Sequence, residues 1–224
     1  MKDYFTITNE DNMLLMARCP DNYFDLAIVD PPYGIGESKK KRENSKQKWN
    51  NPVKKNHVVK NWDSKTPSLQ YFEELKRVSK NQIIWGGNYF IDKIKEPSMG
   101  WVFWDKKNGD SDFSDGELAY TSFKKGLRKF EWLWSGFQKQ KPEKRIHPTQ
   151  KPEDLYKWLF IHYAKQNDKI LDTHLGSGSI AIALDSVNKI EKMNLTLTAC
   201  ELDKDYFKSA IDRIEKNTNW QSLF

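Results

Sequence analysis

One short segment carries residue types that suit chemistry on the exocyclic amine of a nucleobase: Asp30, Pro31, Pro32 and Tyr33. Such an amine is a poor nucleophile, because its lone pair is delocalised into the ring. The Asp30 carboxylate and the Pro31 carbonyl could accept its two N–H bonds and localise the lone pair. The prolines fix φ and stiffen the backbone that aims the carbonyl. Tyr33 offers a face on which an extruded base can stack.

A second segment, 169–184, is typical of a cofactor turn between a strand and a helix. A predicted strand ends at Asp172, Gly176-Ser177-Gly178 forms a tight turn, and a helix begins at Ser179. Glycines allow close approach to a ligand, and the helix N-terminus offers free N–H groups. About twenty residues after the turn, Glu201 ends another strand, where an acid can bind ribose hydroxyls. The pattern predicts an adenosine-type cofactor and leaves NAD and S-adenosylmethionine open.

Hydrophobic periodicity indicates the elements that position these segments. Strands are expected over 4–8, 24–30, 82–85, 101–104, 117–123, 170–172 and 195–201. Helices are expected over 13–18, 69–79, 179–187 and 203–216, with a further helix ending at about 165. The apolar run 24–30 suits a buried parallel strand that ends in an acid. Strands that alternate with helices predict one α/β domain over residues 1–224, with a parallel or mixed sheet.

Positive charge is concentrated in two segments. Residues 38–60 hold nine Lys or Arg residues and one acid, and residues 122–151 hold nine against two acids. Aromatic residues lie within both segments, as is typical of nucleic-acid contacts. Loop 37–61 is too long for a passive connector, and we expect it to be mobile and functional. The predicted nucleic-acid-binding residues are Lys39, Lys40, Lys41, Lys46, Lys124, Lys125, Arg128 and Lys139.

Composition excludes several other classes of protein. Among the 224 residues, 9 Trp, 9 Tyr and 12 Phe can fill a core, which excludes a disordered chain. No stretch reaches the 18 or so apolar residues of a membrane span, so no membrane contact is expected. The 2 cysteines cannot build a disulfide framework, so we expect a reduced, cytoplasmic chain. The histidines and cysteines lack ligand spacing, and no metal site is predicted.

Three motifs together resemble the amino DNA methyltransferases of the β group: 30–34 (DPPYG), 147–152 (HPTQKP) and 171–179 (LDTHLGSGS). In that group the catalytic segment precedes the cofactor loop, and the resemblance extends over nearly the whole chain. It implies a single Rossmann-like, S-adenosylmethionine-dependent methyltransferase domain with a mostly parallel, seven-stranded sheet in permuted motif order. It also implies that the strands ending at Asp30 and Asp172 are neighbours.

The resemblance carries roles to individual residues. Asp30, Pro31, Pro32 and Tyr33 correspond to the catalytic segment. The residues that correspond to the S-adenosylmethionine site are Asp11, His147, Thr149, Lys151, Asp172, Thr173, His174, Gly176, Ser177, Gly178 and Glu201. Asp11 could equally be a helix N-cap. Thr173-His174 replaces the usual Pro-Phe, so weaker or pH-sensitive cofactor binding is expected.

The resemblance implies methyl transfer to double-stranded DNA and leaves the base partly open. Asp before Pro-Pro-Tyr favours N6 of adenine over N4 of cytosine, and N6-adenine in RNA is a further alternative. An NAD-dependent oxidoreductase would leave the DPPYG segment unexplained, and a non-catalytic nucleic-acid-binding protein is a remote alternative. The family's recognition element would fall at 122–146, which is short. A homodimer or an accessory partner could therefore complete the grip on DNA.

Overall fold

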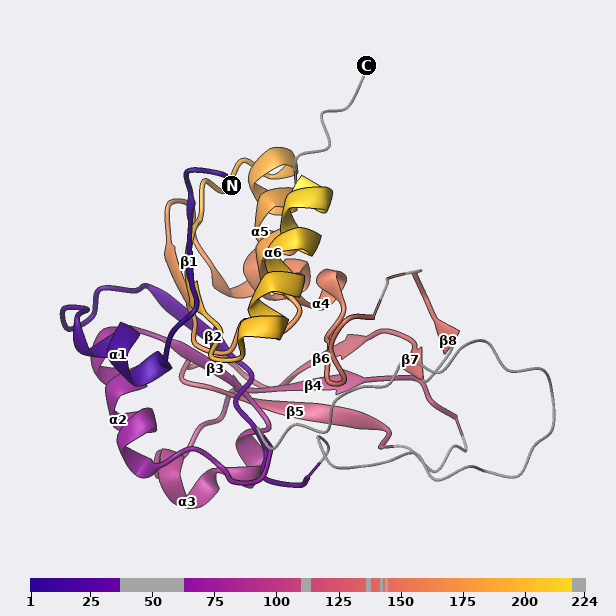
Figure 1. The fold of residues 1–224 in the computed structure, drawn as a ribbon. Coiled ribbons are helices and arrows are strands. Elements are labelled where there is room, and N and C mark those ends of the chain that lie inside the picture. The colour runs from indigo at the N-terminus through magenta and orange to yellow at the C-terminus, as the bar shows by residue number, and fades with distance from the viewer. Residues whose placement is uncertain (37–62, 110–113, 136–137, 142, 144, 219–224) are drawn as a thin grey trace.

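The computed structural model describes residues 1–36, 63–109, 114–135, 138–141, 143 and 145–218. Eight strands form one sheet in the order β1-β10-β9-β2-β3-β5-β4-β6 (Figure 1). These strands are β1 (Phe5–Thr8), β2 (Leu26–Val29), β3 (Gln82–Trp85), β4 (Trp101–Asp105), β5 (Gly116–Thr121), β6 (Arg128–Glu131), β9 (Lys169–Asp172) and β10 (Thr196–Cys200). A separate hairpin joins β7 (Trp134–Ser135) to β8 (Gln138–Lys139).

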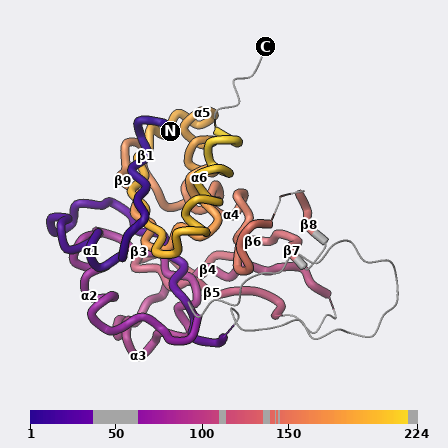
Figure 2. The backbone as a smooth tube through the Cα atoms, viewed as in Figure 1, coloured from indigo at the N-terminus to yellow at the C-terminus, as the bar shows by residue number. Residues whose placement is uncertain are grey.

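Helices cover both faces of the sheet. On one face lie α1 (Asn12–Ala17), α2 (Leu69–Val78) and α3 (Ile91–Ile94), and on the other lie α4 (Glu153–Tyr163), α5 (Ser179–Ile190) and α6 (Lys204–Thr218) (Figure 2). A 3-10 turn, Gly87–Tyr89, links β3 to α3. Local signals start the helices of the first face. Asp11 Oδ1 accepts the Met13 N–H at 2.8 Å, and Ser68 Oγ accepts the Tyr71 N–H at 3.3 Å.

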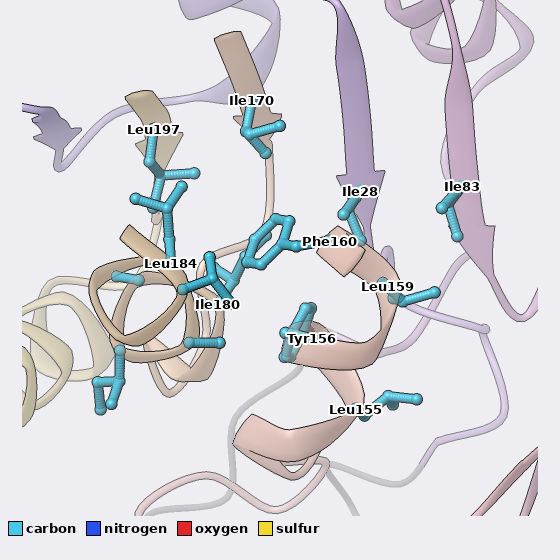
Figure 3. Close-up of a cluster of buried hydrophobic side chains, with 14 of the residues drawn as sticks. Ile28, Ile83, Leu155, Tyr156, Leu159, Phe160, Ile170, Ile180, Leu184 and Leu197 are labelled. Atoms are coloured by element: carbon cyan, nitrogen blue, oxygen red, sulfur yellow. The ribbon is translucent and has the colours of Figure 1, made fainter. Parts of the chain in front are cut away.

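Alternation along β2 divides the core into two clusters. Leu26 and Ile28 face α4 and α5, whereas Ala27 and Val29 face α1 and α2. All four side chains are buried, as expected for a central strand that is covered on both faces. Figure 3 shows side chains of β2, β3, β9 and β10 on the face of the sheet that α4 and α5 cover, directed toward these two helices. This packing fixes the strand ends that carry the candidate site.

The architecture confirms the predicted α/β fold, and the strands that end at Asp172 and Val29 are parallel neighbours. The predicted number of seven strands is wrong, because β6 adds an eighth strand beside β4. Its sequence alternates too weakly to indicate a strand, since within it only Phe130 is buried. The sheet is mixed, since β5 is antiparallel to both β3 and β4. Within the described ranges, no helix is long and apolar enough to cross a membrane.

Strand direction brings distant residues to one edge of the sheet. The parallel strands β1, β10, β9, β2 and β3 all end at this edge. Because β5 runs the other way, it begins there, so Glu117 lies at the same edge as Asp30. Ligand sites in open α/β sheets are found outside the carboxyl ends of the strands. The edge is therefore where the candidate site is built.

Candidate active site

Asp30 directly follows the last residue of β2, and each of its two carboxylate oxygens contacts a hydrogen-bond donor. Its Oδ1 accepts the Tyr33 hydroxyl at 2.8 Å, and its Oδ2 lies 2.6 Å from Lys151 Nζ. The Lys151 side chain is only 3% exposed, although the residue is 121 positions away from Asp30 in the sequence. The predicted segment 30–33 and the predicted segment 147–152 therefore meet at this carboxylate. The lysine that was predicted in the cofactor site directs its ammonium to the predicted catalytic acid.

A second carboxylate completes this cluster. Glu117, the second residue of β5, has its Oε2 at 3.0 Å from Lys151 Nζ and its Oε1 at 2.7 Å from Lys106 Nζ. The Tyr33 hydroxyl also lies 3.2 Å from Glu117 Oε2. We call Asp30, Glu117, Lys106 and Lys151 the carboxylate–lysine cluster. Glu117 and Lys106 were not predicted from the sequence, because no motif surrounds them.

Charge pairing and burial act against each other in this cluster. Burial raises the pKa of the Asp30 carboxyl above its usual value, and the Lys151 ammonium opposes that rise. Burial would also raise the pKa of Glu117, but the ammonium groups of Lys151 and Lys106 outweigh it and hold that pKa at about 2. Two carboxylates and two ammonium groups leave the cluster formally neutral, as buried charges require.

Aromatic residues fix the ring of Tyr33. One face of the ring stacks on Tyr89, with centroids 5.0 Å apart and planes 16° apart, and Phe90 meets it edge-on. Gly86 lies so close that a Cβ there would come within 2.3 Å of the Tyr33 ring. Gly86 also has φ +69°, which favours glycine. The segment after β3 therefore forms a platform for the predicted stacking residue.

A cavity of about 540 Å³ opens beside Asp30 at the same edge. It is lined by most of the predicted cofactor residues: Asp11, His147, Thr149, Lys151, Thr173, His174, Gly176, Ser177 and Glu201. Asp172 and Gly178 are not among the lining residues. Five further lining residues were not predicted from the sequence: Glu10, Asn12, Asp203, Lys204 and Tyr206. Five acids and two lysines line the wall, so the cavity suits a cation better than the pyrophosphate of NAD.

Glu201, the residue directly after β10, is hydrogen-bonded to the glycine turn. Its Oε2 accepts the Gly176 N–H at 2.9 Å, and its Oε1 accepts the Asp203 N–H at 2.9 Å. At Gly178, φ is +73° and a Cβ would come within 2.8 Å of Ile214 on α6, so the turn requires glycine there. Lone pairs that remain on the Glu201 oxygens could accept ribose hydroxyls.

Arg213 on α6 supports the turn from behind. One guanidinium nitrogen donates to Ser177 O at 2.9 Å, and the other lies 2.6 Å from Glu153 Oε1 on α4. This arginine joins two helices to the glycine turn. No sequence motif indicated it, since it lies in an ordinary amphipathic helix.

The pair that replaces the usual Pro-Phe is hydrogen-bonded to both neighbouring helices. Thr173 Oγ1 lies 2.7 Å from the Tyr71 hydroxyl and 2.9 Å from His174 Nδ1, and His174 Nε2 lies 3.1 Å from Asn12 Nδ2. Burial lowers the pKa of His174 to about 4. The ring is therefore neutral at physiological pH, and the expected pH sensitivity of cofactor binding does not arise from this residue near neutrality.

Asp172 and Asp11 take different positions around the cavity. The Asp172 side chain is buried and accepts the His174 N–H at 2.9 Å, and burial raises its pKa to about 8. Asp11 is the N-cap of α1 and also lines the cavity, so its role as a cap does not remove it from the site, and its contact with the cofactor stays a prediction. The His147 ring lies edge-on to Tyr206, with centroids 4.4 Å apart.

The structure separates the predicted nucleic-acid-binding residues. Lys39, Lys40, Lys41 and Lys46 lie outside the described residues. The register of β4, β5 and β6 places Lys124, Lys125 and Arg128 at the end of the sheet opposite to Asp30. Their assignment to nucleic-acid binding stays a prediction, for a surface away from Asp30, because β6 returns the chain toward the site only after Arg128. Lys139 lies on the hairpin that begins beside Lys106, with its Nζ 4.7 Å from the Trp134 ring centroid.

The family is decided by comparison with known proteins. A family model described as DNA methylase, for N6- and N4-specific methyltransferases, matches residues 24–212. The chain belongs to the N6-adenine/N4-cytosine DNA methyltransferases. Such an enzyme is a site-specific DNA methyltransferase that takes its methyl group from S-adenosylmethionine, which confirms the predicted family and cofactor.

Two curated relatives are similar over most of their length. The Type II methyltransferase M.BglII of Bacillus subtilis is 24% identical, over 97% of this chain and 72% of that protein. The Type II methyltransferase M.HpaI of Haemophilus parainfluenzae is also 24% identical, over 91% of this chain and 72% of that protein. Both relatives are named as Type II methyltransferases.

Solved structures share the fold. The complex of M1.HpyAVI with S-adenosylmethionine has a TM-score of 0.57 at 18% identity, covering 93% of this chain and 99% of that chain. The cytosine-N4-specific PvuII DNA methyltransferase has a TM-score of 0.56 at 11% identity, covering 96% and 93%. At these identities the likeness establishes the methyltransferase fold, and the choice of base needs a separate argument.

Proposed function

We propose that this methyltransferase transfers the methyl group of S-adenosylmethionine to N6 of an adenine extruded from double-stranded DNA. The observation that carries the proposal is the position of Asp30. Its carboxylate lies at the end of β2, lines the cavity, and is bonded to the hydroxyl of a tyrosine held on an aromatic platform. A base that stacks on Tyr33 would thus present its amine to Asp30 at the mouth of the cofactor cavity.

The reaction requires a more nucleophilic amine. S-adenosylmethionine supplies an electrophilic methyl group whose carbon–sulfur bond breaks with its electrons remaining on sulfur. Asp30 and the Pro31 carbonyl accept the two N–H bonds of the amine, which localises the nitrogen lone pair toward that methyl carbon. The new N–C bond leaves a positive charge on nitrogen, and one N–H proton is then lost to water. The Pro31 carbonyl, which the proline backbone fixes in advance, and the Asp30 carboxylate stabilise this developing charge.

The lining of the cavity fits the methyl donor. Glu201 would bind the ribose hydroxyls, because both its oxygens are already oriented by backbone N–H groups. Asp11, His147 and Thr149 all line the cavity. Asp11 would approach the adenine end of the methyl donor, and His147 and Thr149 would approach its methionine end. The excess of acids favours a ligand that carries an ammonium and a sulfonium. We assign Asp172, Thr173, His174, Ser177 and Gly178 to the support of this wall.

The choice of adenine rests on the residue type at position 30. In the methyltransferases that this chain resembles, Asp before Pro-Pro-Tyr favours N6 of adenine. The buried ammonium of Lys151 supports a charged acceptor at this position. N4 of cytosine is the alternative target atom, and RNA is the alternative substrate polymer.

DNA binding needs contacts beyond the cavity. We propose that the basic loop 37–61 and the short segment 122–146 provide them, with Lys139 as the residue of the second segment that lies on the hairpin beside Lys106. A second subunit or an accessory partner would complete the grip, because the recognition segment is short. These contacts would position the duplex through its phosphates.

Nucleoside analysis tests the proposed function. The purified chain is incubated with tritiated S-adenosylmethionine and either unmethylated duplex DNA or RNA, and the products are digested and separated by mass spectrometry. We expect N6-methyladenine from DNA. N4-methylcytosine would replace the adenine assignment, and a label found only in RNA would replace the substrate. No label in any polymer, with S-adenosylmethionine bound, would refute the function.

A further inference from the structure

The two oxygens of Asp30 have different partners. Oδ1 accepts the Tyr33 hydroxyl, and Oδ2 is paired with the Lys151 ammonium. The Tyr33 hydroxyl is a neutral donor on a side chain that is partly exposed, so an incoming N–H could replace it without a change in charge. Lys151 differs in both respects, because it is buried and bridges two carboxylates. Removing its ammonium from Oδ2 would leave buried negative charge without compensation.

A carboxylate attached to a stiff backbone can still turn. The torsion between the Asp side-chain carbon and its carboxyl group has a broad energy profile, so the proline backbone alone does not fix the oxygens. An ammonium at 2.6 Å from one oxygen does fix them. Glu117 in turn keeps Lys151 in place at 3.0 Å, and Lys106 occupies the other oxygen of Glu117. The ring of Trp85, 5.3 Å from Lys151 Nζ, adds a favourable contact for the buried cation.

We propose that Lys151, held by Glu117, is a positioning residue that fixes Oδ2 of Asp30 and thereby directs Oδ1 to the target amine. The inference rests on the proposed function, in which Asp30 accepts that amine. It assigns to the lysine of segment 147–152 a role at the catalytic carboxylate in place of a contact to the cofactor. It also adds Glu117, which no sequence motif indicated, as a second positioning residue.

If the inference holds, variants at Lys151 and Glu117 should shift the acidic limb of the pH–rate profile in opposite directions. Asp30 must be ionised to accept an N–H. Lys151 and Tyr33 contact its carboxylate, and the other charged or titratable groups around it are Glu117, Asp172, Tyr71 and Tyr156. Lys151 lowers the pKa of Asp30, and Glu117 raises it. Loss of the lysine should therefore move the acidic limb of the rate profile to higher pH, and loss of the Glu117 charge should move it to lower pH.

The experiment measures single-turnover methyl transfer against pH for the wild type, Lys151→Met and Glu117→Gln. We expect Lys151→Met to lose about tenfold or more in rate at pH values on the acidic limb, which is the loss that a limb shift of about one unit to higher pH produces there. Glu117→Gln should shift the limb in the opposite direction. The matched control is Lys106→Met, which removes a lysine that contacts Glu117 and not Asp30. Its limb should move less than that of Lys151→Met.

Binding of S-adenosylmethionine separates the inference from the alternatives. Calorimetry should give dissociation constants within about threefold of wild type for both variants, since neither side chain is assigned to the cofactor. A large loss of cofactor affinity in Lys151→Met, with an unmoved limb, would return this lysine to the cofactor site and overturn the inference. Limbs that stay in place, or move in the same direction, would also overturn it. If Lys151→Met does not fold, the Glu117→Gln limb decides alone. A wild type that methylates no DNA contradicts the proposed function instead.

Discussion

Gly86 lies directly against the ring of Tyr33, although 53 positions separate the two residues in the sequence. A Cβ at Gly86 would meet three ring carbons between 2.3 and 2.7 Å. Tyr89 stacks on the same ring. The turn that follows β3 thus fixes the side chain on which we propose the target base to stack.

Gly86→Ala should therefore impair methyl transfer and leave cofactor binding unchanged, because the methyl group displaces Tyr33 and not the cavity wall. Stacking of a base on an aromatic side chain is worth roughly 1–3 kcal/mol, so binding of DNA that contains the target should weaken by up to that amount. Fluorescence anisotropy measures it. The matched control is Gly109→Ala, which has φ +62° and no atom within 4 Å of the added Cβ. Equal losses in both variants would attribute the effect to backbone strain alone.

Asp30→Ala should abolish methyl transfer and leave the affinity for S-adenosylmethionine within a few-fold. The carboxylate is needed when the amine becomes nucleophilic, which is an interaction of the transition state. Single-turnover rates and calorimetry on one preparation separate the two effects. Turnover near that of wild type would remove Asp30 from its proposed role.

Glu201→Gln should raise the dissociation constant of S-adenosylmethionine by about tenfold, because a charge-assisted bond to a ribose hydroxyl is stronger than a neutral one. Titration calorimetry measures the change. Glu191→Gln, at an exposed position after α5, removes the same charge away from the cavity and is the control. Unchanged affinity in Glu201→Gln would exclude the ribose assignment.

The buried carboxyl of Asp172 should make stability depend on pH. Burial raises its pKa to about 8 in the folded chain, whereas the unfolded chain loses this proton near pH 4. Between these values the folded state holds the extra proton, so the contribution of Asp172 to the free energy of unfolding falls as the pH rises from about 4 to about 8. Denaturant titrations of Asp172→Asn should show a flatter pH dependence than wild type. Asp212→Asn, on the exposed part of α6, should keep the wild-type dependence.

Replacing Lys39, Lys40, Lys41 and Lys46 with Gln should weaken binding to all DNA sequences about equally. For every phosphate that these lysines no longer neutralise, the slope of log K against log salt should flatten by about 0.9. Anisotropy at several salt concentrations measures both the affinity and the slope. Preserved sequence preference would assign these lysines to phosphates, whereas a changed target sequence would assign them to bases. An unchanged slope and affinity would show that these lysines contact solvent and not DNA.

The strands that end in functional residues could be predicted from the sequence alone. The apolar run before Asp30, the glycine turn after Asp172 and the strand before Glu201 were each predicted within a few residues of the observed elements. Such segments can be predicted because buried parallel strands are continuous apolar runs and tight turns require glycine. The family and the cofactor were predicted from the resemblance of these motifs to known methyltransferases.

The charge pairs across the site depend on the tertiary structure and could not be predicted from the sequence. Glu117 reaches Asp30 because β5 is antiparallel to β3, and Lys151 reaches both because α4 packs on the sheet behind them. The same register places Arg128, which was predicted to bind nucleic acid, at the end of the sheet opposite to Asp30. Strand direction and register depend on contacts between residues far apart in sequence. A single chain read along its length carries no local signal of which distant side chains will meet.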